Sequence, residues 1–146
     1  HGRALFDPAV TTAYRSSLLP HARVVCPNGH EAVLLAGEDG LDGEALARRL
    51  GAPTVVTGGR ADGVEAIDTL HDGGEPLTLR TRRVATANNA GSGDALSAHL
   101  AAGLAQGMSL RHALVDAKAR VHAALVASAD WTLGSGPGPL DHAARP

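Results

Sequence analysis

The chain has 146 residues, a formal net charge of −2, and 44% hydrophobic but only 2% aromatic residues. This length and composition fit a single globular domain over residues 1–146, and the mild acidity without a basic stripe argues against a nucleic-acid partner. No apolar run approaches the roughly 20 residues that a membrane-spanning helix needs, so no membrane role is expected.

The first residue, the cysteine content and the histidine pattern of the chain bear on its length, its cellular compartment and metal binding. The chain begins at His1, and its single methionine is Met108, so we expect it to be part of a longer polypeptide. The single cysteine, Cys26, cannot form an internal disulfide, which fits the cytoplasm, and it is expected to be a structural thiol. None of the eight histidines stands in a zinc-binding pattern, so scattered surface or capping histidines are favoured over a metal centre.

Short apolar runs alternate with helical stretches through the first sixty residues. The strand-like runs end in proline or glycine, the first of them in Asp7-Pro8. Parallel strands joined by helical crossovers are the simplest arrangement of such a pattern. The predicted strands are 4–6, 24–26 and the stretch APTVVTGG, and the predicted helices are 14–19, 31–35 and 43–50.

The second half of the chain changes from strands to helices. Two alternating runs, 64–70 and 77–84, flank the turn sequence HDGGEP and predict a hairpin at the edge of the sheet. Leucines at every fourth position then predict a helix that starts near Asp94 and ends before a Gln-Gly pair. Ser109 is expected to cap a second helix with its own apolar stripe.

A glycine-rich turn lies in front of the first of these helices, in the sequence NNAGSGDALSAHL. Unpaired N–H groups of the first helical turn are expected to point outward at Gly91, Ser92 and Gly93, where the helix dipole attracts phosphate. A carboxylate there, Asp94, has a use if it accepts the proton of a substrate hydroxyl as that oxygen attacks phosphorus. The alternative is that Asp94 only stabilises the helix N-terminus.

Polar groups also follow the predicted strands of the first half. Asn28 and Glu31 in PNGHE lie three residues apart at the start of a helix, a spacing suited to the hydrated Mg²⁺ of a nucleotide. The alternative is an N-cap and capping box. Asp7 and the pair Thr57-Gly58 follow other strands, and open α/β sheets bind ligands at the carboxyl ends of their strands.

In their order along the chain, these segments resemble those of the ribokinase superfamily, and within it the hydroxymethylpyrimidine and phosphomethylpyrimidine kinases. The matching segments are FDPAV, LLPHARVVCPNGHEAVLLAG, TVVTGGRADG, the long segment that begins NNAGSGDALSAHL, and the ending GSGPGPLDH. The resemblance covers nearly the whole chain and implies a ribokinase-like α/β fold, a three-layer sandwich of a mostly parallel sheet, flanking helices and an edge hairpin. This chain would be its C-terminal nucleotide-binding portion.

The resemblance also implies transfer of the γ-phosphoryl group of ATP, with Mg²⁺, to a hydroxymethyl or phosphate oxygen of a pyrimidine in thiamine biosynthesis. Asp94 would be the base, and the last two helices would shape the adenine pocket. Lys118 would bind the cofactor if its helix borders the nucleotide, but Asp116 and Arg120 beside it also fit a solvated face. The other implied contacts are Gly91, Ser92 and Gly93 as the anion hole, Asn28 and Glu31 for Mg²⁺ and phosphates with Asp7 nearby, and Thr57 and Gly58 for phosphate or ribose.

Three departures from the family pattern keep other functions open. Asp94 stands where the pyrimidine kinases commonly carry cysteine, as in pyridoxal and sugar kinases, so a kinase of that kind is one alternative. Thr57 replaces the family's lysine, and family members run to about twice this length, so a truncated, non-catalytic nucleotide-binding module is another. An absent N-terminal half would expose apolar surface, which a homo-oligomer or the missing half would cover.

Overall fold

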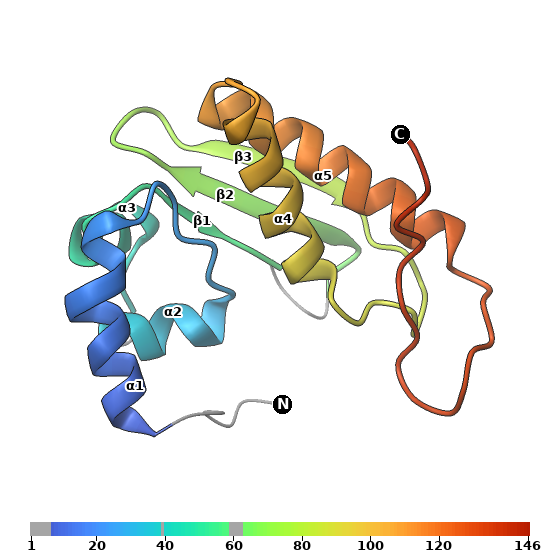
Figure 1. The fold of residues 1–146 in the computed structure, drawn as a ribbon, viewed down its shortest axis with the longest axis horizontal. Coiled ribbons are helices and arrows are strands. Elements are labelled where there is room, and N and C mark those ends of the chain that lie inside the picture. Colours follow the sequence, from blue (N-terminus) through green and yellow to red (C-terminus); the bar gives the residue numbers. More distant parts are fainter. Residues whose placement is uncertain (1–6, 39, 59–62) are drawn as a thin grey trace. The chain divides into compact units, whose positions relative to one another are not determined.

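The computed structural model describes residues 7–38, 40–58 and 63–146 (Figure 1). It divides into two compact units, unit 1 (His1–Arg80) and unit 2 (Thr81–Pro146). The strand predicted at 4–6 lies outside the described residues. None of the described helices is both long and apolar enough to cross a membrane.

Unit 1 opens with a helix that starts earlier than the sequence predicted. α1 (Pro8–Ala13) continues into a π-helical stretch, η1 (Tyr14–Leu18), and a 3₁₀ turn, η2 (Leu19–His21). The start is fixed by Asp7, whose Oδ1 accepts a hydrogen bond from the N–H of Ala9 at 2.8 Å, and by a proline at the first helical position. The helix predicted at 14–19 is therefore the second half of a longer one.

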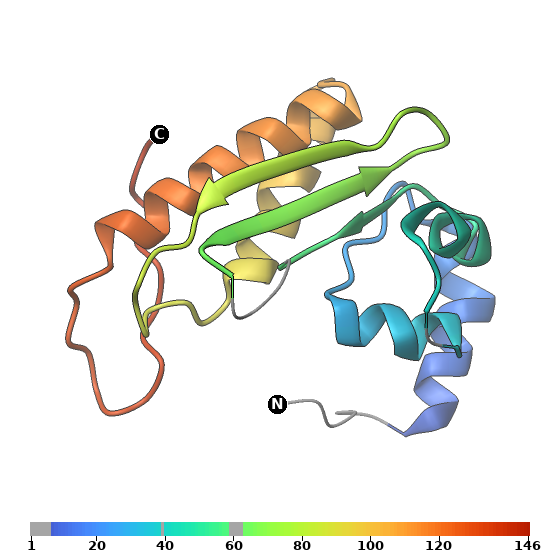
Figure 2. The ribbon, with the colours of Figure 1, turned by 180° about the vertical axis from the view of Figure 1, so that it is seen from behind.

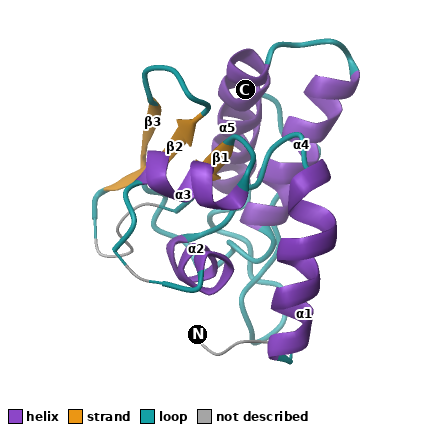
Figure 3. Cartoon of the chain, turned by 90° about the vertical axis from the view of Figure 1, so that its left-hand side faces the viewer, coloured by secondary structure: helices purple, strands orange, loops and turns teal. Residues whose placement is uncertain are grey.

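The next two helices have the predicted bounds within two residues. α2 (Gly29–Ala36) ends at Gly37 and α3 (Gly43–Leu50) ends at Gly51, and both glycines adopt the left-handed conformation, with φ of 78° and 72°. That conformation terminates a helix and is easily adopted by glycine. α3 lies against the first two strands of the sheet (Figure 3). The buried core of this region consists of Leu19, Ala32, Ala36, Leu46 and Leu50.

The sheet has three strands in the order β1-β2-β3: β1 (Thr54–Val56), β2 (Glu65–His71) and β3 (Leu77–Arg82). β1 and β2 are antiparallel, and Val55 lies opposite Leu70 in the register. Both of these side chains are fully buried. The predicted mostly parallel pairing is therefore not found among these three strands.

β2 and β3 form the predicted hairpin at one edge of this sheet (Figure 2). The hydroxyls of Thr69 and Thr78 lie 3.4 Å apart, and Arg80 contacts Glu65 at 3.1 Å. From Glu65 to Thr69 the chain moves forward along β2, while the contacted residue on β3 moves back from Arg80 to Thr78, as an antiparallel pair requires.

In the described part of unit 1, parallel pairing is present as two isolated bridges beside β1, Val25 with Thr54 and Asn28 with Thr57. The N–H of Thr57 donates to the carbonyl of Pro27 at 2.9 Å. The predicted strand at 24–26 is thus an extended segment beside β1, and Pro27, which has no N–H, limits its ladder. The predicted parallel neighbours are confirmed, but not as a regular strand.

Unit 2 contains a helical hairpin, α4 (Ser92–Ala105) and α5 (Leu110–Ala127). Ser109 caps α5 as predicted, since its side chain accepts a hydrogen bond from the N–H of His112 at 3.3 Å. The two helices approach closely near the loop, where a Cβ on Gly103 would lie 3.0 Å from that of Ala113. Small residues on the facing sides make this packing possible.

Candidate functional site

The start of α4 is the glycine turn that the sequence singled out. Gly91 is its N-cap residue, with φ of 80°, and makes no side-chain capping bond. The N–H of Ser92 donates to the carbonyl of Asn89 at 3.2 Å, so one of the N–H groups predicted to be unpaired is paired within the turn. Among the described residues, the N–H groups of Gly93 and Asp94 have no hydrogen-bond acceptor. They can receive an anion.

Asp94 lies in the first turn of α4 with an exposed side chain. Its Oδ2 is 3.9 Å from where a Cβ on Gly91 would stand, so the carboxylate lies close to the turn. Within the described chain no hydrogen bond or ion pair engages it. A carboxylate that caps nothing can accept a proton beside a bound anion, although its position also suits the helix dipole.

The C-terminal segment meets the same turn within unit 2. Ala90 forms a parallel bridge with Pro139, and its N–H donates to the carbonyl of Gly138 at 3.2 Å. The glycine- and proline-rich ending GSGPGPLDH is therefore paired with the chain directly before Gly91.

Four of the predicted site residues are neighbours in unit 1. Asn28 and Glu31 form a complete capping box: Glu31 Oε2 accepts from the N–H of Asn28, and Asn28 Oδ1 accepts from the N–H of Glu31, both at 2.9 Å. The bridge between Asn28 and Thr57 puts Thr57 and Gly58 beside this helix start. Asp7, by contrast, has only a local role here, as the N-cap of α1.

The capping box bears on whether these side chains fit Mg²⁺. Direct ligation by Asn28 Oδ1 would compete with the cap, whereas Glu31 Oε1 lies outside the box. Mg²⁺ keeps several waters and is commonly held by one or two carboxylates. The residues therefore fit a hydrated ion held through Glu31. Among the described residues there is no group of three or more metal-ligating side chains.

A carboxylate that the sequence interpretation missed, Asp68, supports the turn after β1. Its Oδ1 accepts a hydrogen bond from the N–H of Gly58 at 2.9 Å, and the residue is only 4% exposed. The signal was present in the sequence, because Asp68 shares one face of β2 with the fully buried Leu70.

Lys118 is not on a solvated face. It is 8% exposed, on the side of α5 that also buries Leu114 and Val121. Beside it, Asp116 and Arg120 are half-buried. Arg120 Nε donates to Asp116 Oδ2 at 2.7 Å, and this hydrogen bond raises the pKa of Arg120. The solvated-face interpretation is wrong because Lys118 follows Leu114 by one helical turn.

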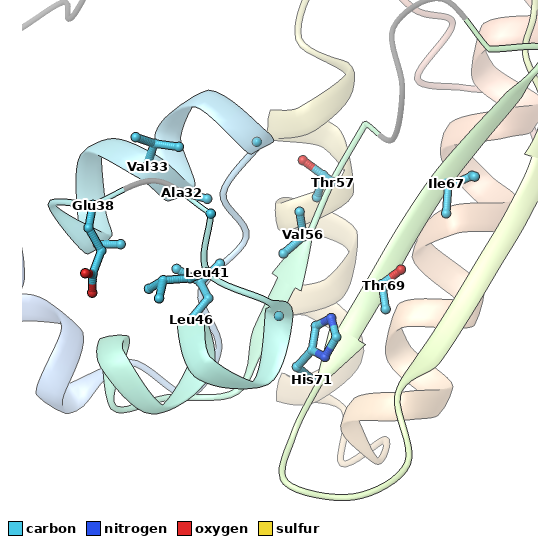
Figure 4. Close-up of a pocket in the computed structure, with 14 residues that line it drawn as sticks. Ala32, Val33, Glu38, Leu41, Leu46, Val56, Thr57, Ile67, Thr69 and His71 are labelled. Atoms are coloured by element: carbon cyan, nitrogen blue, oxygen red, sulfur yellow. The ribbon is translucent and has the colours of Figure 1, made fainter.

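Unit 1 also contains a cavity of about 420 Å³ between α2, α3, β1 and β2 (Figure 4). Of the predicted site residues only Thr57 lines it, and its other walls are mostly apolar, such as Val56 and Ile67. Its polar end is closed by His71, whose Nδ1 lies 3.4 Å from Glu44 Oε1. The described residues that line it include no lysine or arginine that could pair with a phosphate.

A family model for phosphomethylpyrimidine kinase matches residues 1–141. The chain belongs to the phosphomethylpyrimidine kinase family. It is 40% identical to a hydroxymethylpyrimidine/phosphomethylpyrimidine kinase of Rhizobium meliloti, over 97% of this chain and 56% of that protein. It is 36% identical to a thiamine biosynthetic bifunctional enzyme of Arabidopsis thaliana, over 97% of this chain and 29% of that one.

The fold of this phosphomethylpyrimidine kinase family member is also found in solved structures. The pyridoxal kinase of Staphylococcus aureus in complex with AMP-PCP and pyridoxal matches 98% of this chain and 56% of its own, with a TM-score of 0.85 and 31% identity. The predicted ribokinase-like α/β fold is confirmed by this likeness. The chain spans about half the length of these kinases.

Proposed function

We propose that this chain carries the nucleotide-phosphate site and the catalytic base of an ATP-dependent kinase that phosphorylates hydroxymethylpyrimidine or its phosphate in thiamine biosynthesis. The observation that carries the proposal is the uncapped start of α4, where the N–H groups of Gly93 and Asp94 lie beside an unengaged carboxylate. An anion site next to a proton acceptor is what phosphoryl transfer to an alcohol requires.

In this mechanism Asp94 takes the proton of the substrate hydroxyl while the hydroxyl oxygen bonds to the γ-phosphorus of ATP. The bond from phosphorus to the bridging oxygen breaks, and ADP leaves with that electron pair. The main-chain N–H groups of Gly91, Gly93 and Asp94 stabilise the charge that develops on the phosphoryl oxygens, whereas that of Ser92 already donates to the carbonyl of Asn89. The other proposed contacts are Glu31 and Asn28 for hydrated Mg²⁺ and the phosphates, with Asp7, Thr57, Gly58 and Lys118 on the nucleotide.

Two classes of phosphoryl acceptor are candidates. The family match and the Rhizobium relative support a pyrimidine alcohol or its phosphate. A pyridoxal-type acceptor is the second candidate, favoured by Asp94 in place of the family's usual cysteine and by the likeness to the pyridoxal kinase fold. The lone Cys26 supports a cytoplasmic location for either enzyme.

Calorimetry with Mg-ADP tests the nucleotide site directly. We expect wild-type binding that depends on Mg²⁺ and weakens in Glu31→Gln, because glutamine keeps the capping box but removes the charge that holds the ion. Glu38→Gln, an exposed carboxylate just beyond α2, is the matched control and should bind as wild type does. Absence of Mg-ADP binding by the folded chain would contradict the proposal for this chain.

Phosphoryl transfer is then assayed with hydroxymethylpyrimidine, its phosphate and pyridoxal as acceptors. Turnover of the first two supports the thiamine-pathway function, and turnover of pyridoxal alone supports the second candidate. Nucleotide binding without transfer to any of the three would leave this chain as a binding module.

A further inference from the structure

Asn88 is a buried polar residue to which the proposed mechanism gives no role. It is 5% exposed and lies three residues before Gly91. Its Nδ2 donates to the carbonyl of Ser128 at 2.7 Å and to that of Trp131 at 2.9 Å. Both acceptors lie just beyond α5, so one side chain links the approach to the glycine turn with the segment that follows the helical hairpin.

The other side of the Asn88 amide is enclosed as tightly. A Cβ on Gly138 would collide with Asn88 Oδ1, so this glycine leaves the room that the amide occupies. The carbonyl of the same Gly138 accepts the N–H of Ala90 at 3.2 Å. Gly138 thus packs against the side chain of Asn88 and accepts a main-chain hydrogen bond from Ala90.

Thr86 adds a third connection. Its Oγ1 accepts the N–H of Asn88 at 3.0 Å and donates to the carbonyl of Ala129 at 2.9 Å. The stretch 86–90 is therefore fastened at three successive alternate residues to segment 128–139, and the next residue is Gly91. Such a buried network favours one geometry, because a break leaves a buried polar group without its partner.

We propose that Asn88 is a positioning residue, which fixes the direction of the Gly91–Gly93 main-chain N–H groups by tying their approach to segment 128–139. Its effect on phosphate rests on the proposed function. Its effect on the geometry of the turn does not, and the two can be measured separately.

Asn88→Asp keeps the shape of the side chain but turns the donating nitrogen into an acceptor that faces two carbonyls. We expect Mg-ADP binding to weaken about tenfold or more. Amide exchange, followed by NMR, should quicken at Ala90, Ser92 and Ala95, whose N–H groups are hydrogen-bonded in or next to the turn, but not at Leu100 in the middle of α4. Asn89→Asp adds the same charge one residue later and measures the effect of charge alone.

A second pair of variants decides the matter if Asn88→Asp does not fold. Gly138→Ala places a methyl group against Asn88 Oδ1, whereas Gly136→Ala adds one where nothing lies within 4 Å. Only the first should weaken Mg-ADP binding and quicken exchange in the turn. Because Asn88→Ala removes the obstructing oxygen, the double variant Asn88→Ala/Gly138→Ala should lose no more than Asn88→Ala alone.

Equal effects of Gly138→Ala and Gly136→Ala, additive losses in the double variant, or unchanged exchange at Ala90, Ser92 and Ala95 would overturn the positioning role. So would a uniform loss of protection through α4 and α5, which marks a merely structural residue. If the wild type does not bind Mg-ADP, the proposed function fails, and the exchange comparison still decides the role of Asn88.

Discussion

The starts of α2 and α4 are built in opposite ways. At α2 Asn28 and Glu31 exchange two hydrogen bonds, so both side chains are engaged in the cap. At α4 a left-handed glycine replaces the capping side chain, and the carboxylate of Asp94 caps nothing. Both helices present the positive end of their dipole at the start, so the difference lies in the carboxylate that is left for a ligand. At the start of α4, the open start, the whole carboxylate is available beside a bound anion, whereas at the start of α2, the closed start, only Glu31 Oε1 lies outside the cap.

The largest effect should come from the carboxylate at the open start. Asp94→Asn removes the proton acceptor while keeping the shape of the side chain, so turnover should fall by about 10²- to 10⁴-fold. Mg-ADP binding should persist, since a negative charge next to the phosphates has been removed. Asp130→Asn, on an exposed carboxylate of the same unit, is the control for kinetic assays and calorimetry. Equal turnover in the two variants would rule out Asp94 as the base.

Two glycines of the open start test different requirements: Gly91 the left-handed backbone conformation, and Gly93 the room for a bound anion. Gly91→Ala forces a side chain into the left-handed region and should lower the free energy of unfolding by roughly 1–2 kcal/mol. Gly93→Ala lies where a Cβ meets nothing within 4 Å, so stability should not fall, but the new methyl group should weaken Mg-ADP binding. Urea denaturation and calorimetry on the two variants give these values. A stable Gly91→Ala variant would show that the turn does not need its glycine.

Substitutions at the closed start should change the free energy of unfolding as substitutions of a helix cap do. Asn28→Ala should cost about 1 kcal/mol of unfolding free energy, because it removes the acceptor for the N–H of Glu31. Asn28→Ser keeps a capping oxygen and should restore most of that loss in urea denaturation. If Asn28→Ser restores stability but still weakens Mg-ADP binding, Asn28 contacts the ligand as well as capping the helix.

The smallest effect is expected at the half-buried Asp116–Arg120 pair of α5. Asp116→Asn removes the negative charge that faces Arg120, yet a partly solvated i,i+4 pair adds little to stability. The melting temperature, measured by circular dichroism, should stay within error of wild type. A clear drop would mean that this face of α5 is less solvated than its exposure indicates.

Local signals in the sequence were enough for several elements. The bounds of α3 and the Ser109 cap follow from nearest-neighbour chemistry, and each is found where it was predicted. The alternation of strands and helices indicated an α/β fold, and the family resemblance specified its ribokinase-like form. Turn sequences also predicted the β2–β3 hairpin correctly.

What failed depends on partners distant in sequence. Asp68 and Lys118 share a face with the buried Leu70 and Leu114, but charged residues are seldom buried, so what packs over that face decides. The Asn28–Glu31 spacing suits a capping box and a metal-linked site equally well, since both need an oxygen at the helix start. Asn88 stands inside the segment NNAGSGDALSAHL, but its acceptors lie 40 residues or more along the chain.

The distance along the chain between Asn88 and its acceptors bears on the order in which the helices and the glycine turn fold. The hairpin of α4 and α5 consists of local contacts and can form early, whereas the bonds from Asn88 to Ser128 close a loop of 40 residues. The glycine turn is therefore expected to reach its final geometry in a late folding step, after most of the helix that follows it. In a refolding experiment, helical circular dichroism would recover first and competence to bind nucleotide afterwards.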